Sequence, residues 1–316
     1  MKLLVTGGAG YIGSHVVRIA EAAGADVVVV DDLSTGLPKR IDCPLVQIEL
    51  SSDEAIPALT KLMSETQFDA VIHLAARKQV GQSVEQPERY YKDNVGGLAN
   101  LLAAMRATDT LKLVFSSSAA TYGMPDVETV DEDYPGKPIN PYGETKLVGE
   151  WLVRAAAFWG LRSVNLRYFN VAGTGYADLA DTAALNLIPI AIEQIKAGKN
   201  PIVFGDDYPT PDGSCIRDYV HVQDLAQAHI KAVEYLGREE RSFDTFNVGT
   251  GTGASVFEVL SALKVASGED FEVEVGKRRA GDPPRLVANV SRIRDELRFV
   301  CEKDLAEIVQ SSWDAS

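Results

Sequence analysis

The 316-residue sequence carries a formal net charge of −14, and 46% of its residues are hydrophobic. The negative charge disfavours nucleic acid or an anionic membrane as a partner, because phosphate binding depends on positive charge. We find no signal peptide and no apolar run long enough to cross a bilayer, so we expect a cytoplasmic protein. The three cysteines and four histidines lack the spacing of a disulfide framework or a metal site.

The chain begins with the apolar run Lys2–Thr6, which predicts a buried parallel strand. A glycine-rich stretch follows, Gly7-Gly-Ala-Gly-Tyr-Ile-Gly13, and residues 14–23 then show the apolar spacing of a helix. Glycines between a strand and a helix allow a tight turn and a close approach of the backbone to a pyrophosphate at the helix N-terminus. This stretch therefore predicts a dinucleotide-binding loop.

The second predicted strand, residues 26–30, ends at two carboxylates, Asp31 and Asp32. A carboxylate about 20 residues beyond the glycines accepts hydrogen bonds from an adenosine ribose and repels a 2′-phosphate. No basic residue immediately follows the strand. The predicted cofactor is therefore NAD rather than NADP.

Strands and helices continue to alternate, which predicts an α/β fold with a doubly wound parallel Rossmann sheet. The expected strands are 45–48, 70–74, 111–115 and 162–167, and the expected helices are 53–65, 87–107 and 142–159. The alternation loosens after residue 170. We expect a NAD-binding Rossmann domain at 1–170 and a smaller C-terminal α/β substrate-binding lobe at 171–316, with part of 218–250 returning to the first domain.

Tyr142 and Lys146 are four residues apart and should lie on the same helix face. A nearby ammonium favours the phenolate, so we expect Lys146 to lower the Tyr142 pKa from its usual value of about 10. Such a phenol can serve as general acid and base for a substrate hydroxyl. The spacing is common by chance, but Ser118 closes a predicted strand and the glycine-rich stretch precedes both.

These three features together resemble the glycine-rich loop, Ser/Thr and Tyr-x-x-x-Lys triad of the short-chain dehydrogenase/reductase family. The resemblance implies that Tyr142 takes a hydroxyl proton while hydride leaves for NAD, that Ser118 hydrogen-bonds the same oxygen, and that Lys146 also contacts the nicotinamide ribose. Sugar-nucleotide dehydratases of this family carry acidic residues where this chain has Ala119 and Ala120. Reversible oxidation at one carbon is therefore favoured over elimination of water.

Longer stretches resemble the UDP-glucose 4-epimerases of this extended family, from Met1 to about Ala288. The most specific is Asp212-Gly-Ser-Cys-Ile-Arg-Asp-Tyr-Val-His-Val222, and Leu166-Arg-Tyr-Phe-Asn170 also matches. The resemblance implies reversible C4 epimerisation of a UDP-hexose, UDP-glucose or UDP-galactose, through a 4-keto intermediate with tightly bound NAD.

The resemblance also implies a set of site residues without a metal. The catalytic residues are Tyr142, Lys146 and Ser118. The cofactor-binding residues are Gly7, Gly10, Tyr11, Ile12, Gly13, Asp31, Asp32, Leu33, Ser34, Thr35, Gly36, Glu49, Leu50, Leu74, Ala75, Ala76, Lys78, Asn94, Ser116, Tyr142, Lys146 and Phe169. The substrate-binding residues are Lys78, Ser118, Tyr142, Asn170, Asn186, Leu187, Phe204, Arg217, Arg279 and Asp282.

Two alternatives remain open from the sequence. The first is a 4-epimerase of another UDP-sugar, UDP-N-acetylglucosamine or UDP-glucuronate, since Leu286 stands where the family residue beside the sugar 2-position varies in size. The second is a catalytically silent NAD-sensing regulator. Regulators of this fold commonly lack the Tyr or the Lys, and this chain has both.

The predicted helices 87–107 and 142–159 suggest a symmetric homodimer. Leu147, Trp151 and Phe158 fall on the side of their helix opposite to Tyr142, where a monomer would expose them. The outer face of the neighbouring helix is made of small residues, namely Gly96, Ala99, Ala103 and Ala107. Large and small apolar faces are complementary under two-fold symmetry. The alternative is that a C-terminal segment of the same chain covers this surface.

Overall fold

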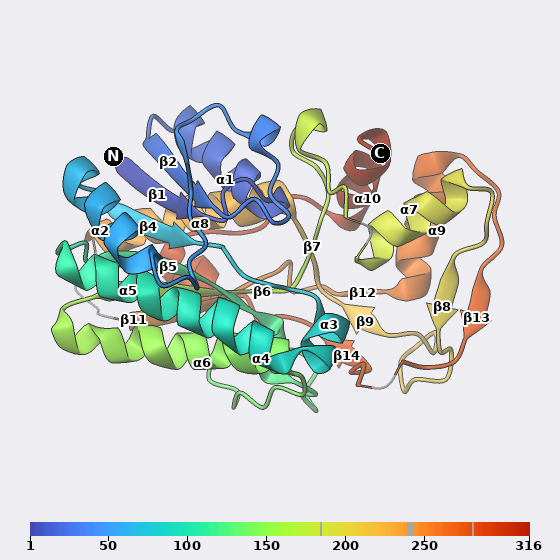
Figure 1. Ribbon diagram of the computed structural model, residues 1–316. Helices are drawn as coiled ribbons and strands as arrows, with labels where there is room; N and C mark the ends of the chain where they lie inside the picture. Colours follow the sequence, from blue (N-terminus) through green and yellow to red (C-terminus); the bar gives the residue numbers. More distant parts are fainter. Residues whose placement is uncertain (184, 239–242, 280) are drawn as a thin grey trace. The chain divides into compact units, whose positions relative to one another are not determined.

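A computed structural model describes residues 1–183, 185–238, 243–279 and 281–316 (Figure 1). The chain forms two compact units. The first comprises residues 1–121, 136–167 and 226–246, and the second comprises 122–135, 168–225 and 247–316. The segment 218–250 was expected to return in part to the first domain, and its residues 239–242 lie outside the described residues. Segment 122–135, expected in the first domain, groups with the second unit.

The first unit is built on a seven-stranded sheet with the order β11-β6-β5-β4-β1-β2-β3. Neighbours β1–β2, β1–β4, β2–β3 and β4–β5 pair in parallel, which confirms the predicted doubly wound α/β fold. The strand order reverses between β1 and β4, the place where ligands bind in such sheets. The strands are β1 (Lys2–Thr6), β2 (Asp26–Asp31), β3 (Leu45–Gln47), β4 (Ala70–His73), β5 (Lys112–Ser118), β6 (Arg162–Tyr168) and β11 (Phe243–Val248).

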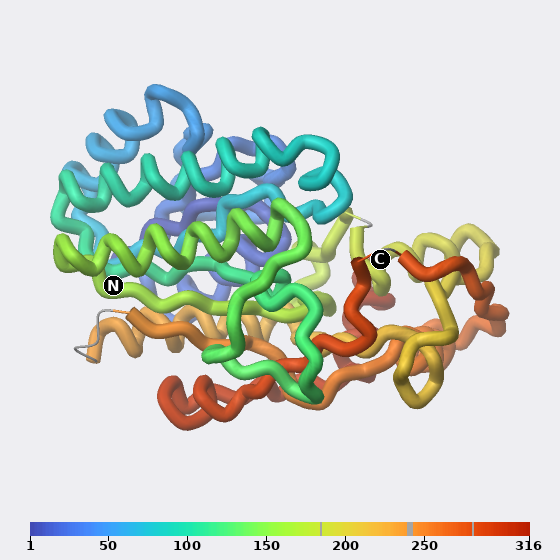
Figure 2. Tube along the Cα trace, turned by 90° about the horizontal axis from the view of Figure 1, so that it is seen from below, coloured from blue at the N-terminus to red at the C-terminus, as the bar shows by residue number. Residues whose placement is uncertain are grey.

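Helices α5 and α6 lie side by side over this sheet (Figures 1 and 2). Leu98, Leu101 and Met105 of α5 are fully buried in one core cluster that also contains Val153 of α6 and Phe115 of β5. These three residues form the side of α5 that faces the sheet. The helices of this part of the chain are α1 (Tyr11–Ala22), α2 (Ala55–Thr66), α3 (Val80–Glu85), α4 (Pro87–Tyr90), α5 (Gly97–Ala107), α6 (Pro141–Ala156) and α8 (Val222–Arg238).

The segment expected as one regular helix, 87–107, contains a π-helical stretch at Tyr91–Gly96 between α4 and α5. A π-helical turn carries one more residue than an α-turn and is frequent at functional sites. The stretch changes the direction in which Asn94 points relative to a regular helix. Apolar periodicity alone did not reveal it, because the buried positions of α5 follow the ordinary helical spacing.

The start of α6 is well defined by its local sequence. Pro141 occupies the first helical position, and the Asn140 side chain accepts a hydrogen bond of 2.9 Å from the Gly143 amide. Proline is favoured there because its missing N–H has no intrahelical partner to lose, and asparagine is a strong N-cap. These two residues fix where the helix that carries Tyr142 and Lys146 begins.

The second unit has its own core, to which α7 (Leu187–Lys196), α9 (Val256–Ser267) and α10 (Leu305–Asp314) contribute. Ile308 and Val309 of the C-terminal helix α10 are fully buried in this core. The strands form small sheets: β7 (Asn170–Ala172) with β10 (Tyr219–His221), β8 (Ile202–Phe204) with β13 (Glu274–Gly276), and β9 (Ile216–Arg217) between β12 (Ala254–Ser255) and β14 (Arg285–Leu286).

Short helical turns complete the description: Pro38–Arg40, Ala119–Tyr122, Ala157–Trp159, Ala177–Leu179 and Ile293–Leu297. In the part of the chain that the structure describes, we find no helix with the length and apolar character that a membrane span requires.

Candidate active site

The glycine-rich loop follows β1 at the switch point of the sheet. Gly7 has a φ of +75°, and a Cβ atom placed on it would lie 2.6 Å from the Ala75 amide nitrogen in the loop after β4. A Cβ atom on Gly13 would lie 2.1 Å from the Gly7 carbonyl oxygen. Any side chain at either position would therefore separate the N-terminus of α1 from the strand ends. The tight turn and the helix N-terminus that follows it fit the pyrophosphate of a dinucleotide.

The carboxylate at the end of β2 is tied to this loop. Asp31 is buried, and its two oxygens accept hydrogen bonds from the amides of Ala9 at 3.0 Å and Leu33 at 2.9 Å. Burial raises the Asp31 pKa, and the two backbone hydrogen bonds oppose that rise. The exposed Asp32 accepts hydrogen bonds from the amide and hydroxyl of Ser34. Asp31 thus shapes the turn where an adenosine ribose is expected.

The structure brings the predicted catalytic residues together within the first unit. Ser118 is the last residue of β5, and its hydroxyl lies close enough to the phenol of Tyr142 on α6 to affect the Tyr142 pKa. The Lys146 ammonium nitrogen donates to the Ser116 carbonyl oxygen at 2.8 Å and lies 6.0 Å from the centre of the Tyr142 ring. A serine hydroxyl, a phenol and a buried ammonium therefore adjoin the carboxyl end of the central sheet.

The expected lowering of the Tyr142 pKa is wrong in this structure. Burial raises the Tyr142 pKa, the nearby Ser118 hydroxyl opposes that rise, and Tyr90 adds to it. Burial also lowers the Lys146 pKa to about 7, against the attraction of Glu150. The physical reason is that desolvation disfavours the charged form of both groups, and it outweighs the effect of Ser118 on Tyr142 and of Glu150 on Lys146.

Four buried polar side chains that the sequence analysis missed lie near Lys146. The Glu150 carboxylate, one turn further along α6, receives hydrogen bonds from the Arg167 guanidinium at 2.8 and 2.6 Å and from the Ser117 hydroxyl. His73 of β4 is held neutral, because burial and the nearby Lys146 lower its pKa to about 3. A spacing of four from Lys146 to Glu150 was the only available signal, and it is common in solvent-exposed helices.

The remaining predicted cofactor residues of the first unit lie on loops after the strands, at the start of α1 and, for Asn94, in the π-helical stretch. Asn94 is buried, but its side-chain amide bonds the backbone of Arg77 and the hydroxyl of Thr145, whereas Lys78 is exposed. Glu49 is exposed, and its carboxylate accepts a hydrogen bond of 3.3 Å from the Ser51 hydroxyl. The other members occupy the loops after β1, β2, β3 and β4 and the start of α1: Gly10, Tyr11, Ile12, Thr35, Gly36, Leu50, Leu74 and Ala76.

The predicted substrate residues of the second unit form two pairs. The Arg279 guanidinium carbon lies 3.8 Å from the centre of the Phe204 ring. Arg217 donates to the Pro283 carbonyl oxygen at 2.7 Å and lies 3.6 Å from an Asp282 carboxylate oxygen. One arginine is therefore held against an aromatic ring at the end of β8, and a second is held beside a carboxylate at the end of β9.

Five further predicted or candidate positions also lie in the second unit. Asn170 is exposed on β7, Asn186 immediately precedes α7, and Leu187 is its first residue. Phe169, predicted to contact the cofactor, is buried with its ring centre 6.4 Å from that of Tyr122. Leu286 is buried on β14, in register with Arg217 of β9. Among the described residues, no group of three or more His, Cys, Asp or Glu could hold a metal ion.

Comparison with known proteins places these features in a family. The model of the NAD dependent epimerase/dehydratase family matches residues 3–249. A UDP-glucose 4-epimerase of Azospirillum brasilense is 46% identical, covering 100% of this chain and 92% of that protein. A UDP-glucose 4-epimerase of Corynebacterium glutamicum is 42% identical, covering 99% and 95%.

Solved structures agree with the sequence relatives. A UDP-glucose 4-epimerase from Stenotrophomonas maltophila, with bound NAD and formylated UDP-arabinopyranose, superposes with a TM-score of 0.94 at 37% identity, covering 100% of this chain and 97% of that one. The UDP-Glc/GlcNAc 4-epimerase of Campylobacter jejuni gives 0.87 at 39% identity, with 99% and 98% covered. The predicted resemblance and the predicted NAD cofactor are confirmed: this chain belongs to the NAD dependent epimerase/dehydratase family.

Proposed function

We propose that this protein catalyses the reversible inversion of C4 in a UDP-hexose, interconverting UDP-glucose and UDP-galactose through a 4-keto sugar. The observation that carries the proposal is the grouping of Ser118, Tyr142 and Lys146 at the end of a sheet whose glycine loop fits a dinucleotide. The two relatives at 46% and 42% identity, both UDP-glucose 4-epimerases, support it.

NAD, held by the glycine loop and Asp31, would supply the group that takes hydride from C4 of the sugar and gives it back to the opposite face. Tyr142 removes the proton of the C4 hydroxyl through its phenolic oxygen and gives a proton back when the hydroxyl forms again. Ser118 donates a hydrogen bond to the same oxygen. The charged form of Lys146 stabilises the phenolate of Tyr142. The Lys146 ammonium also donates a hydrogen bond to the Ser116 carbonyl, and this bond holds the lysine side chain in place.

In the second unit, Arg217 and Arg279 are proposed to bind the diphosphate and Phe204 to stack on the uracil ring. Guanidinium groups offer paired planar donors that match phosphate oxygens. Phe204 keeps 36% of its surface exposed even with Arg279 against its ring, so an apolar area remains for a base. Asn170, Asn186, Leu187 and Asp282 are proposed to complete the substrate contacts.

A second candidate substrate is UDP-N-acetylglucosamine, because the similar C. jejuni enzyme acts on UDP-Glc and UDP-GlcNAc. Leu286 is proposed to border the sugar 2-position, where its branched side chain would clash with an N-acetyl group. We therefore expect a much lower kcat/KM for UDP-N-acetylglucosamine than for UDP-galactose, with a smaller difference in Leu286→Ala. Equal values for both sugars in the wild type would assign another role to Leu286.

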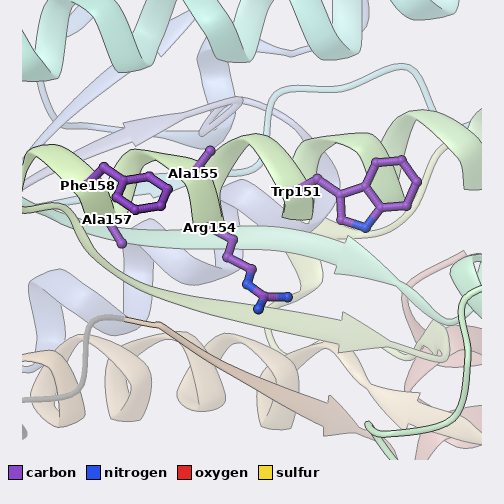
Figure 3. A pocket seen from close by; sticks show the side chains of 5 residues that line it. All are labelled: Trp151, Arg154, Ala155, Ala157 and Phe158. Atoms are coloured by element: carbon purple, nitrogen blue, oxygen red, sulfur yellow. The ribbon is translucent and has the colours of Figure 1, made fainter.

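We also propose a homodimer formed through α5 and α6. Trp151 is 60% exposed and Phe158 is 97% exposed. These two residues, with Arg154, Ala155 and Ala157, line a hollow of about 580 Å³ along the outer side of α6 and the turn that follows it (Figure 3). Ala99, Ala103 and Ala107 of α5 are exposed as well. A second copy would bury both faces under two-fold symmetry.

One residue expected in this interface is not available to it. Leu147 is buried, because its side chain packs against the segment at Gly136, where an added Cβ would lie 2.9 Å away. The proposed contact therefore rests on Trp151 and Phe158.

The cytoplasmic location stays a prediction from the sequence.

The decisive experiment incubates purified protein with UDP-galactose and follows the appearance of UDP-glucose by proton NMR. We expect conversion in both directions to the same equilibrium without added NAD, and loss of conversion in Tyr142→Phe. A folded protein that retains NAD but inverts neither this sugar nor the N-acetylated one would instead support the silent regulator.

A further inference from the structure

Lys78 lies in the loop that follows β4, and the residue before it is held at both of its backbone groups by one side chain. The Arg77 amide donates to the Asn94 side-chain oxygen at 2.7 Å, and the Asn94 side-chain nitrogen donates to the Arg77 carbonyl at 3.0 Å. An asparagine amide can therefore replace the pairing that a neighbouring strand would provide.

The residue after Lys78 is held in the same way by a different side chain. The Gln79 amide donates to the Tyr90 hydroxyl at 3.0 Å, and that hydroxyl donates to the Gln79 carbonyl at 2.7 Å. The Tyr90 side chain is completely buried, which fixes the position of its hydroxyl. The backbone is thus clamped on both sides of Lys78, while the Lys78 side chain itself is exposed.

Both clamping side chains come from one helical segment. Tyr90 ends α4, and Asn94 lies four residues later within the π-helical stretch Tyr91–Gly96. Residues four apart project from the same side of a helix, and the wider π-turn adjusts the direction of the second one. The π-helical stretch therefore has a physical role, which is to aim two side chains at one loop.

The same clamp reaches the helix that carries the proposed catalytic residues. The Asn94 side-chain nitrogen also donates to the Thr145 hydroxyl at 3.0 Å, and that hydroxyl donates to the Tyr142 carbonyl at 2.8 Å. Thr145 is buried between Tyr142 and Lys146 on α6. A displacement of the Lys78 loop would therefore break a hydrogen bond next to the catalytic pair.

We propose that Tyr90 and Asn94 are positioning residues that hold the backbone of Lys78, so that its ammonium is presented to a diphosphate group. The proposal rests on the proposed function. Loops move more than the elements they connect, and lysine is a flexible point charge. Fixing its backbone reduces the conformational freedom lost when the ammonium binds an anion, which increases affinity without a new contact. The diphosphate belongs either to NAD or to the UDP-sugar.

The clamp itself is tested by amide hydrogen exchange, which requires no activity. Tyr90→Phe removes only the hydroxyl, and we expect the Gln79 amide to exchange at least about tenfold faster. Tyr91→Phe is the matched control, since the Tyr91 hydroxyl donates to the Glu144 carboxylate and does not contact the loop. Unchanged exchange of Gln79 in Tyr90→Phe would overturn the clamp even if the protein proves not to be an epimerase.

The role of the clamp is tested by a double-mutant cycle. We expect Tyr90→Phe to reduce the affinity for the diphosphate ligand at least about fivefold when Lys78 is present. In a Lys78→Ala background it should have no further effect, because both substitutions remove the same interaction. A higher KM for UDP-galactose with NAD retained identifies the substrate diphosphate, and reduced NAD content identifies the cofactor diphosphate. Additive effects of the two substitutions would show a general structural role and overturn the proposal.

A second variant covers the case in which Tyr90→Phe does not fold. Asn94→Asp keeps an acceptor for the Arg77 amide but removes the donors to the Arg77 carbonyl and the Thr145 hydroxyl. We expect the same dependence on Lys78, together with a lower kcat because the link to α6 is lost. An Asn94→Asp protein with wild-type kcat and KM would contradict the proposal.

Discussion

Glu150 and Arg167 form a paired ion contact inside the first unit, one helical turn from Lys146. The two guanidinium-to-carboxylate distances are 2.8 and 2.6 Å, and less than a tenth of either side chain is exposed. Burying two charges is costly, and an apolar pair of similar size often stabilises a protein equally well. The pair joins α6 to β6, and its third partner, Ser117, belongs to β5.

We predict that Arg167→Met destabilises the protein by about 3–5 kcal/mol, because it leaves the Glu150 carboxylate buried without its partner. Urea unfolding followed by circular dichroism measures the change. The double variant Glu150→Leu/Arg167→Met should recover most of that loss, since no charge remains buried. A single variant as stable as wild type would show that the carboxylate reaches water or becomes protonated at little cost.

Replacing Tyr142 by Phe should reduce the rate of epimerisation about 10²–10⁴-fold, because the proton carrier is removed. NAD should remain bound, since the change does not alter the glycine loop or Asp31. The measurements are kcat with UDP-galactose and the NAD content of the purified protein. Tyr91→Phe serves as the control. Activity within a few-fold of wild type would remove Tyr142 from the proposed role.

The Lys146 pKa of about 7 predicts how stability depends on pH. The unfolded chain, with the ordinary lysine pKa of about 10.4, binds more protons at this group than the folded chain between these two values. Lys146 therefore makes the unfolding free energy rise with pH, by about 2 kcal/mol between pH 7 and pH 9.

The check is the difference in urea stability between pH 7 and pH 9, measured for wild type and Lys146→Met without NAD. Other groups titrate in both proteins and cancel in the comparison. The variant should lack the increase that Lys146 contributes. Equal pH dependence in the two proteins would mean that the ammonium is not desolvated in the folded state.

Trp151→Glu should convert the proposed dimer into monomers, because it places a charge in the centre of an apolar contact between two copies. Analytical ultracentrifugation at micromolar concentration measures the mass of wild type and variant. Val265→Glu is a suitable control, since Val265 is 85% exposed on α9 of the second unit. Wild-type protein that sediments as a monomer would refute the dimer, whatever the variant does.

Much of the first unit was predictable because its signals are local. A buried parallel strand appears in the sequence as a short apolar run. A phosphate-binding turn requires glycine where one backbone segment lies close to another, as it does at Gly7 and Gly13. The helix start at Asn140 and Pro141 and the spacing of Tyr142 and Lys146 likewise depend on a few neighbouring residues. The resemblance to a known family added the roles of residues far apart in the sequence, and these roles remain proposals.

The tertiary structure decided what depends on burial and on contacts between distant segments. It reversed the expected direction of the Tyr142 pKa, because the cost of desolvation depends on the whole surroundings and not on the spacing to Lys146. It buried Leu147, which helical periodicity had placed outside, and it paired Glu150 with Arg167. It also aimed Tyr90 and Asn94 at the backbone around Lys78, a relationship that a sequence pattern cannot encode because hydrogen bonds to backbone groups leave no trace in the identities of Arg77 and Gln79.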